Sequence, residues 1–272
     1  CYKVGPTLGG GTAALMVNDS ILYPYCYKSF EILDNGPLRF TVKLEYNPLT
    51  VKGESDIVET RIISLDAGTQ LNKTTVSYSN LKENTPIVAG IVLHEPADVC
   101  RYVASADKGY IGYADPTDNV DNNNGIIYVG AVFPQALNDA KPVFYSEKEK
   151  TNERGGADGQ LLAISEYTPG SDFVYYWGAG WSKYGFDTPE SWFSYLEQAA
   201  AAIQQPHQAC RAEHQPDQSL GAQLAQAVVA KAAAIVSAVN IGVVGCQDGF
   251  EGGQQRPHDD HSAGHAEQQH MF

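Results

Sequence analysis

The sequence predicts an all-β protein, an antiparallel β-sandwich with one short C-terminal helix. Short apolar runs follow one another along the first two thirds of the chain, and turns or polar loops separate them. Gly and Pro are common between these runs, and aromatic residues are plentiful (16 Tyr, 9 Phe and 3 Trp). Because no helical pattern intervenes between the runs, we expect antiparallel sheets rather than βαβ units.

The clearest strand covers residues 38–46. Apolar and polar side chains alternate without a break there, which is typical of a strand with one buried and one wet face. Residues 34–37 (Asp-Asn-Gly-Pro) precede it and predict a turn. Arg39 belongs to the wet face and is expected to be solvated.

The next strand, residues 57–65, places two charged residues on an apolar face. Because every second residue of a strand faces the same side, Glu59 and Arg61 share a face with Ile57, Ile63 and Leu65. Further strands are expected at 86–94, 109–114, 125–133, 159–167 and 172–178.

The helix is expected to begin at Thr188. Thr188 is a suitable N-cap, Pro189 suits the first helical position, and Glu190 favours the positive end of the helix dipole. Trp192, Tyr195 and Leu196 then form a face that can be buried.

Composition and charge exclude several classes of partner. The net charge of −14 argues against nucleic acid and anionic membrane surfaces, although a few local cations can still bind an anionic sugar. The five cysteines include no Cys-x-x-Cys pair, so neither a zinc site nor a redox motif is expected. Residues 115–125 favour an Asx-rich turn over a calcium loop, and no phosphate-binding loop is present. The sequence therefore predicts no metal and no cofactor.

Composition changes abruptly near residue 198. We expect a partial β-sandwich domain over residues 1–197 and an Ala/Gln/His-rich tail, helical or disordered, over 198–272, such as a frameshift or a misjoined end would produce. Polar residues interrupt the apolar stretch 220–245, so no membrane span is expected. The start at Cys1 without a signal peptide predicts a fragment that lacks its N-terminal part.

Two groups of residues are candidates for catalysis. His94 follows an apolar strand and can act as a general base where it opens onto a cleft, or it can be a hydrogen-bonded structural histidine. Arg61 with Glu59 can grip a substrate carboxylate, or the two can form an ion pair at the margin of the sheet.

Aromatic residues gather at 175–192, which includes all three tryptophans. We expect a strand that ends at Trp177 and turns through Gly-Ala-Gly to Trp181. The two indole rings can stack on sugars or seal the edge of the core. Tyr175 or Tyr176 can supply a phenolic acid, although only one of them can face the cleft. Lys183 can reach an acidic group or remain an exposed lysine.

Residues 175–183 (Tyr-Tyr-Trp-Gly-Ala-Gly-Trp-Ser-Lys) resemble the C-terminal signature of a bacterial family known as domain of unknown function 4861 (DUF4861). Residues 32–39, 59–72 and 89–94 resemble its inner strands, and the likeness extends over about residues 2–197. The resemblance implies a sandwich similar to the galactose-mutarotase and polysaccharide-lyase supersandwich. It also implies a further N-terminal region in the family, and a secreted or periplasmic location among enzymes that degrade uronate-containing polysaccharides.

These observations lead to a hypothesis of elimination on uronic-acid oligosaccharides by a lyase or dehydratase. Arg61 would neutralise the carboxylate, His94 would take the proton, and Tyr175 or Tyr176 would protonate the departing oxygen. Glu59, Trp177, Trp181 and Lys183 are the expected substrate contacts. The alternatives are a non-catalytic glycan-binding module, or an epimerase or hydrolase on the same fold. The sequence does not indicate an oligomeric state.

Overall fold

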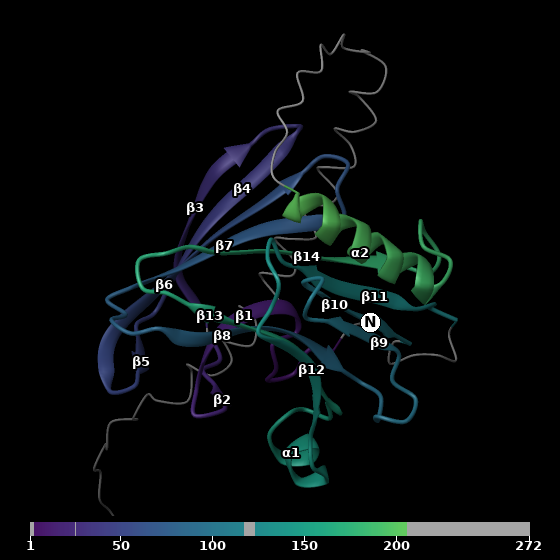
Figure 1. The fold of residues 1–272 in the computed structure, drawn as a ribbon, viewed down its shortest axis with the longest axis horizontal. Coiled ribbons are helices and arrows are strands. Elements are labelled where there is room, and N and C mark those ends of the chain that lie inside the picture. The colour runs from purple at the N-terminus through teal and green to yellow at the C-terminus, as the bar shows by residue number, and fades with distance from the viewer. Residues whose placement is uncertain (1–2, 25, 117–122, 206–272) are drawn as a thin grey trace, which may run out of the picture.

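The computed structural model describes residues 3–24, 26–116 and 123–205, and these form two packed antiparallel sheets (Figure 1). The predicted β-sandwich is therefore confirmed. None of the described helices is long and apolar enough to cross a membrane. Most of the predicted Ala/Gln/His-rich tail lies outside the described residues.

The smaller sheet has five strands in the order β12 (Asp139–Phe144), β13 (Gly159–Tyr167), β8 (Thr85–Leu93), β1 (Gly10–Val17) and β2 (Ser20–Ile21). The larger has nine. Eight of them follow the order β3 (Tyr27–Asn35), β4 (Arg39–Tyr46), β6 (Glu54–Asp66), β7 (Leu71–Ser79), β14 (Phe173–Trp181), β11 (Ile127–Val132), β10 (Tyr110–Asp115) and β9 (Tyr102–Ser105). The ninth, β5 (Leu49–Val51), pairs with β6. Two helices complete the described fold, α1 (Glu147–Asn152) and α2 (Pro189–Gln204).

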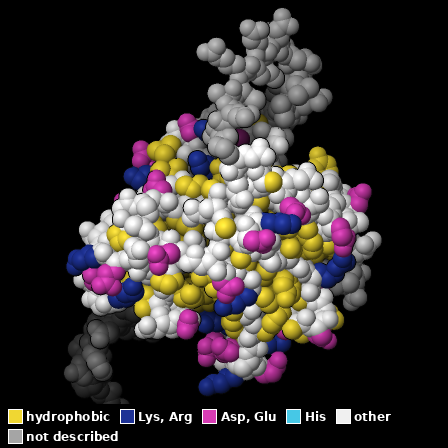
Figure 2. Space-filling model, in the orientation of Figure 1, with side chains coloured by type: hydrophobic (Ala, Val, Ile, Leu, Met, Phe, Trp, Pro, Cys, Tyr) yellow, Lys and Arg dark blue, Asp and Glu magenta, His cyan; other side chains and the backbone are white. Residues whose placement is uncertain are grey.

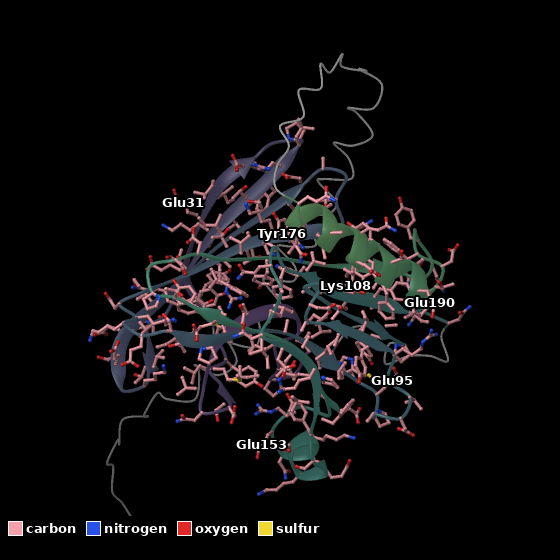
Figure 3. The ribbon with its side chains drawn as sticks, viewed as in Figure 1. Glu31, Glu95, Lys108, Glu153, Tyr176 and Glu190 are labelled. Carbon is pink, nitrogen blue, oxygen red and sulfur yellow. The ribbon has the colours of Figure 1, made fainter. Side chains whose placement is uncertain are left out.

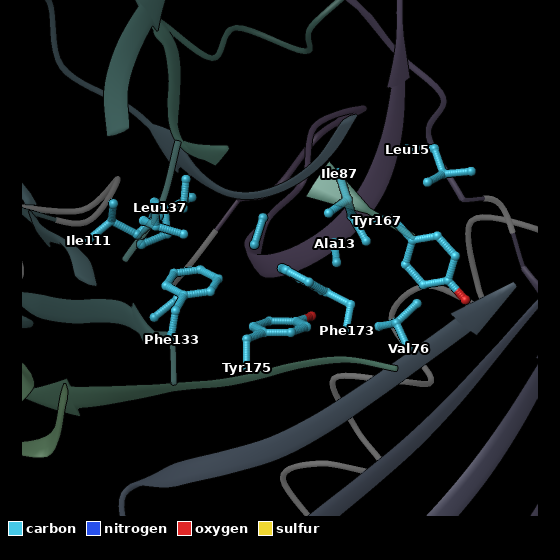
Figure 4. Close-up of a cluster of buried hydrophobic side chains, with 14 of the residues drawn as sticks. Ala13, Leu15, Val76, Ile87, Ile111, Phe133, Leu137, Tyr167, Phe173 and Tyr175 are labelled. Carbon is cyan, nitrogen blue, oxygen red and sulfur yellow. The ribbon is translucent and has the colours of Figure 1, made fainter. Parts of the chain in front are cut away.

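The main core lies between the sheets. Alternate residues of β8 and β13 point inward and pack against inward residues of β10, β11 and β14, because successive side chains of a strand face opposite sides. Phe133, Phe173 and Tyr175 form an aromatic group at its centre (Figure 4), with the Phe133 and Tyr175 ring centroids 5.9 Å apart.

A second core lies under α2, on the outer face of the larger sheet (Figure 1). Trp192 and Leu196 are fully buried there, and Trp192 Nε1 donates to the Val129 carbonyl at 3.2 Å. A Cβ atom on Gly130 would stand only 2.5 Å from the Leu196 side chain, so this glycine lets the helix approach the sheet closely. The helix continues to Gln204, past residue 197 where the sequence predicts the end of the domain.

The predicted N-cap of this helix is confirmed. Thr188 Oγ1 accepts from the Ser191 backbone N–H at 3.2 Å, and Ser191 Oγ accepts from the Thr188 backbone N–H at 3.4 Å. We expect Thr188→Ala to lower the free energy of unfolding by about 1 kcal/mol, because one helical N–H loses its acceptor. Urea denaturation measures this, with Thr188→Ser as the control that keeps the hydroxyl. An equal loss in both variants would contradict the capping role.

The turn expected between Trp177 and Trp181 is wrong. β14 runs straight through Gly178, Ala179 and Gly180 and pairs with β11 along its whole C-terminal half. The two glycines serve close packing instead. A Cβ on Gly178 would stand 2.0 Å from the Gln70 carbonyl oxygen, and one on Gly180 would stand 2.7 Å from the Phe186 ring. Glycine within a strand often marks such an approach rather than a turn.

Candidate active site

His94 follows the last residue of β8 and meets Asp115, the last residue of β10 in the opposite sheet. His94 Nδ1 lies 2.6 Å from Asp115 Oδ2. The Asp115 side chain is only 1% exposed, whereas that of His94 is 23% exposed. A buried carboxylate therefore fixes one ring nitrogen of a histidine whose ring still reaches solvent, as in many histidines that transfer protons.

The surroundings of His94 favour its charged form. Burial by itself lowers the pKa of His94, but the hydrogen bond and the charge of Asp115 raise it. A hydrogen bond to the Lys3 backbone and the charge of Asp158 act in the same direction, and the net shift of the pKa is upward. The ion pair therefore stabilises the fold fully below pH 6.5, and this contribution is lost as the pH rises through the folded-state pKa.

A titration of His94 by NMR is expected to show this shift. We expect the pKa of His94 to lie above its ordinary value of 6.5, and Asp115→Asn to lower it because the carboxylate charge is removed while the burial remains. The His94→Gln variant identifies the His94 resonance among those of the seven histidines. A pKa unaffected by Asp115→Asn would show that the two residues are not paired.

Two further groups, Tyr113 and Glu95, lie beside this pair. The Tyr113 hydroxyl accepts from the His94 backbone N–H at 3.3 Å and donates to Glu95 Oε2 at 3.3 Å. Partial burial, together with the charges of Asp115 and Asp158, raises the pKa of Glu95 despite the bond from Tyr113. Glu95 is thus a carboxyl group disposed to hold a proton.

Cys100 feels the charges of the same carboxylates, and its environment disfavours the thiolate. Burial, together with the charges of Glu95, Asp115 and Asp158, raises the pKa of the Cys100 thiol to about 12. The thiolate is the reactive form of cysteine, and it is scarce at neutral pH when the pKa is so high. Within the described ranges, no three His, Cys, Asp or Glu side chains form a group that could hold a metal ion.

Arg61 and Glu59 lie elsewhere, buried between the sheets. Arg61 Nε donates to Glu59 Oε1 and Arg61 Nη2 donates to the Ala13 carbonyl at 2.7 Å, while the guanidinium stacks 4.8 Å from the centroid of the Tyr46 ring. Arg61 and Glu59 are 5% and 1% exposed. The alternative of an ion pair is therefore what the structure shows, although the pair is inside the sandwich and not at its margin.

Arg61 also bonds to the part of β1 that β2 does not cover. The Leu15 carbonyl of β1 accepts from Leu22 beyond β2, and the Ala13 carbonyl, two residues earlier, points to the same side. β2 pairs only with Met16 and Val17, so it does not reach Ala13. Arg61 supplies the missing donor, since a buried carbonyl without a partner is costly.

Arg61 and His94 do not share a site. Ala13 lies opposite Ala89 in β8, and His94 follows five residues later, about 16 Å along the strand. A cavity of about 50 Å³ next to Glu59 has room for little more than a water molecule.

The tyrosines proposed as acids are also separated from His94. Tyr175 is 1% exposed and packs in the core, where burial and the charge of Glu59 raise its pKa to about 12 despite the nearby Arg61. Tyr176 faces the other side of β14 and packs under α2, well apart from Glu95 (Figure 3). The expectation that neighbouring tyrosines face opposite sides is confirmed, and neither of them reaches His94.

The indole rings do not form one platform. Trp177 is partly buried between the sheets, and its Nε1 donates to Thr74 Oγ1 at 2.8 Å. Trp181 is 44% exposed at the end of β14, where its Nε1 donates to the Asn124 carbonyl at 2.7 Å. Lys183 Nζ lies 5.9 Å from the Trp181 ring and donates to the Asn123 carbonyl. Trp181 is the tryptophan that remains available to a sugar.

Sequence reasoning singled out His94 as a candidate but did not identify Asp115, Glu95 and Tyr113 as its neighbours. One signal was available. Ile111, Tyr113 and Asp115 share the inward face of β10, so an acidic residue ends an otherwise apolar row. A carboxylate on such a face needs a partner, because an unpaired buried charge is costly.

Two comparisons relate this chain to known proteins. A family model described as "Domain of unknown function (DUF4861)" matches residues 1–209. The "Uncharacterized protein P7" of Formosa agariphila is 23% identical over 207 residues, which cover 75% of this chain and 48% of that protein. The chain therefore spans about half the length of this curated relative.

Proposed function

The chain belongs to the DUF4861 family, and on this premise we propose that it is a carbohydrate-active enzyme that cleaves or dehydrates uronic-acid oligosaccharides by elimination. The observation that carries the proposal is the pair of His94 with the buried Asp115, beside a carboxyl group whose pKa is raised. Elimination needs a base and an acid close together, and these residues supply both.

In the proposed reaction His94 takes the proton on the sugar carbon next to the carboxylate. The electron pair of that C–H bond forms a carbon–carbon double bond, and the bond from the neighbouring carbon to its oxygen substituent breaks. Glu95 donates a proton to the departing oxygen, so the products are an unsaturated uronate and either an alcohol or water. Asp115 is a positioning residue, since it holds the ring through Nδ1 and stabilises its charged form.

The Lys3 backbone is hydrogen-bonded to the His94 ring, and substrate would replace this contact. Hydrogen bonds of catalytic groups commonly rearrange when the substrate enters. Because the base must be neutral, we expect the rate to rise with pH through the pKa of His94.

An oligosaccharide panel tests the proposal. Uronate-containing oligosaccharides are incubated with the protein, and new ultraviolet absorbance from the unsaturated uronate is followed. Hydrolysis would release reducing ends without this absorbance. Epimerisation would exchange the carbon-bound proton with deuterium from solvent without cleavage, and a binding module would bind without turnover. Each of these three outcomes would overturn elimination.

We further propose export to the periplasm or the exterior, where such polysaccharides are met. Cys26 is disulfide-bonded, and disulfides persist in oxidising compartments. The face of the protein shown in Figure 2 carries acidic and basic side chains interspersed, so the net negative charge does not form one repelling patch on that face.

A further inference from the structure

Arg154 lies between two tyrosine rings just after α1. Its guanidinium carbon is 5.1 Å from the centroid of the Tyr23 ring and 5.5 Å from that of the Tyr145 ring. Arg154, Tyr23 and Tyr145 are each partly exposed residues, although Arg154 Nε and the Tyr145 hydroxyl are buried. Arg154 thus lies in an aromatic setting that favours a cation.

Among the described residues, no carboxylate lies within ion-pair distance of Arg154, and in this Arg154 differs from the other described arginines. The others each have such a partner, in the pairs Arg39–Asp66, Arg61–Glu59 and Arg101–Glu190. Arg154 makes one long hydrogen bond, from Nη1 to the Pro6 carbonyl at 3.4 Å, and its Nε is buried without an acceptor. The charge of Arg154 lowers the pKa of Glu149 slightly from a distance, but the Glu149 carboxylate accepts its hydrogen bond from Ser146.

An arginine without a counter-ion is unexpected in a chain with a net charge of −14. A planar guanidinium of this kind matches a carboxylate, which it binds through two parallel hydrogen bonds. The Tyr23 ring is held in place. Gln160 Nε2 donates to the Tyr23 hydroxyl at 2.9 Å, and Gln160 Oε1 accepts from the Leu8 backbone N–H at 2.7 Å. A ring fixed in this way suits the apolar face of a sugar.

Arg154 and His94 flank the same stretch of chain. The Lys3 backbone bonds to His94, and the Pro6 carbonyl, three residues later, bonds to Arg154. The Asp158 backbone makes a second connection. Its N–H donates to the carbonyl of Leu93, which precedes His94, and its carbonyl accepts from the N–H of Tyr145, whose ring lies beside Arg154. A sugar chain that reaches His94 therefore has Arg154 close by.

The geometry points to Arg154, with Tyr23 and Tyr145, as the site that binds a uronate carboxylate of the oligosaccharide. This inference rests on the proposed function and gives the carboxylate a partner, a role that Arg61 cannot fill from the core. It assigns the substrate class to a place on the protein surface.

Calorimetric titration of the complete chain with a glucuronate oligosaccharide tests this site. We expect Arg154→Gln to weaken binding about 10- to 100-fold, because a bidentate charge-assisted pair is lost. Arg39→Gln, which removes an exposed arginine of β4 in the larger sheet, is the matched control and should bind as the wild type does. The same oligosaccharide with its carboxylates reduced to alcohols should bind wild type and Arg154→Gln equally.

Arg154→Lys keeps the charge and is a second variant if Arg154→Gln fails to fold. It should weaken binding by an intermediate factor, because lysine does not form the two parallel bonds. Unchanged affinity in the arginine variants, or equal wild-type affinity for the reduced oligosaccharide, overturns the site. Arg154-dependent binding without an unsaturated product would retain the site and refute elimination. If Arg154→Gln still catalysed elimination with an unaltered KM, the proposed reaction would stand and the Arg154 site would be refuted.

Discussion

Replacing His94 with alanine is expected to lower kcat/KM for uronate elimination by about 10²- to 10⁴-fold, the usual contribution of a general base. His94 is the one histidine of residues 1–197, and its ring has a buried carboxylate on one nitrogen and access to solvent. The formation of the unsaturated uronate, followed by its absorbance, measures the loss.

The control is Arg39→Gln, which breaks an exposed ion pair on the larger sheet and should leave the rate unchanged. Asp115→Asn should lower kcat more than it raises KM, and should shift the acid limb of the pH–rate profile to lower pH, since the carboxylate no longer raises the pKa of His94. Full activity of His94→Ala, with the fold intact by circular dichroism, would remove His94 from the mechanism.

The second large effect concerns stability. We expect Arg61→Met to lower the free energy of unfolding by about 3–5 kcal/mol, because it leaves the buried Glu59 carboxylate without its partner. The Ala13 carbonyl loses its donor as well. Urea denaturation measures the change. Arg39→Met, which breaks an exposed and solvent-screened pair, should change the free energy of unfolding far less than Arg61→Met does.

A double variant separates the lost pair from the lost packing. Glu59→Leu combined with Arg61→Met removes both charges, so much of the stability should return. If Arg61→Met were no more harmful than Arg39→Met, the Arg61–Glu59 pair would not be buried as the structure has it. If the double variant were no more stable than Arg61→Met, the loss of stability would come from the Ala13 carbonyl, which no longer has its hydrogen-bond donor.

Local patterns in the sequence were enough to predict several elements. Alternation over 38–46 predicts β4, and the row from Ile57 to Leu65 predicts which face of β6 is buried. Thr188 and Pro189 predict the start of α2. These features depend on the period of side chains along a strand and on hydrogen bonds within one turn of helix, which neighbouring residues decide.

The site depended on contacts that such patterns do not contain. His94 and Asp115 are 21 positions apart and end strands of different sheets, so only the packing of the sheets brings them together. Gly178 resembles a turn residue, yet it lies in a strand. Glycine is required at this position because the Gln70 backbone leaves no room for a side chain. The sequence by itself determined several of the strands, the alternation of their faces and the helix cap. Only the tertiary structure decided that Arg61 is buried in the core while Arg154 has no ion-pair partner among the described residues, because burial and charge pairing depend on residues distant along the chain.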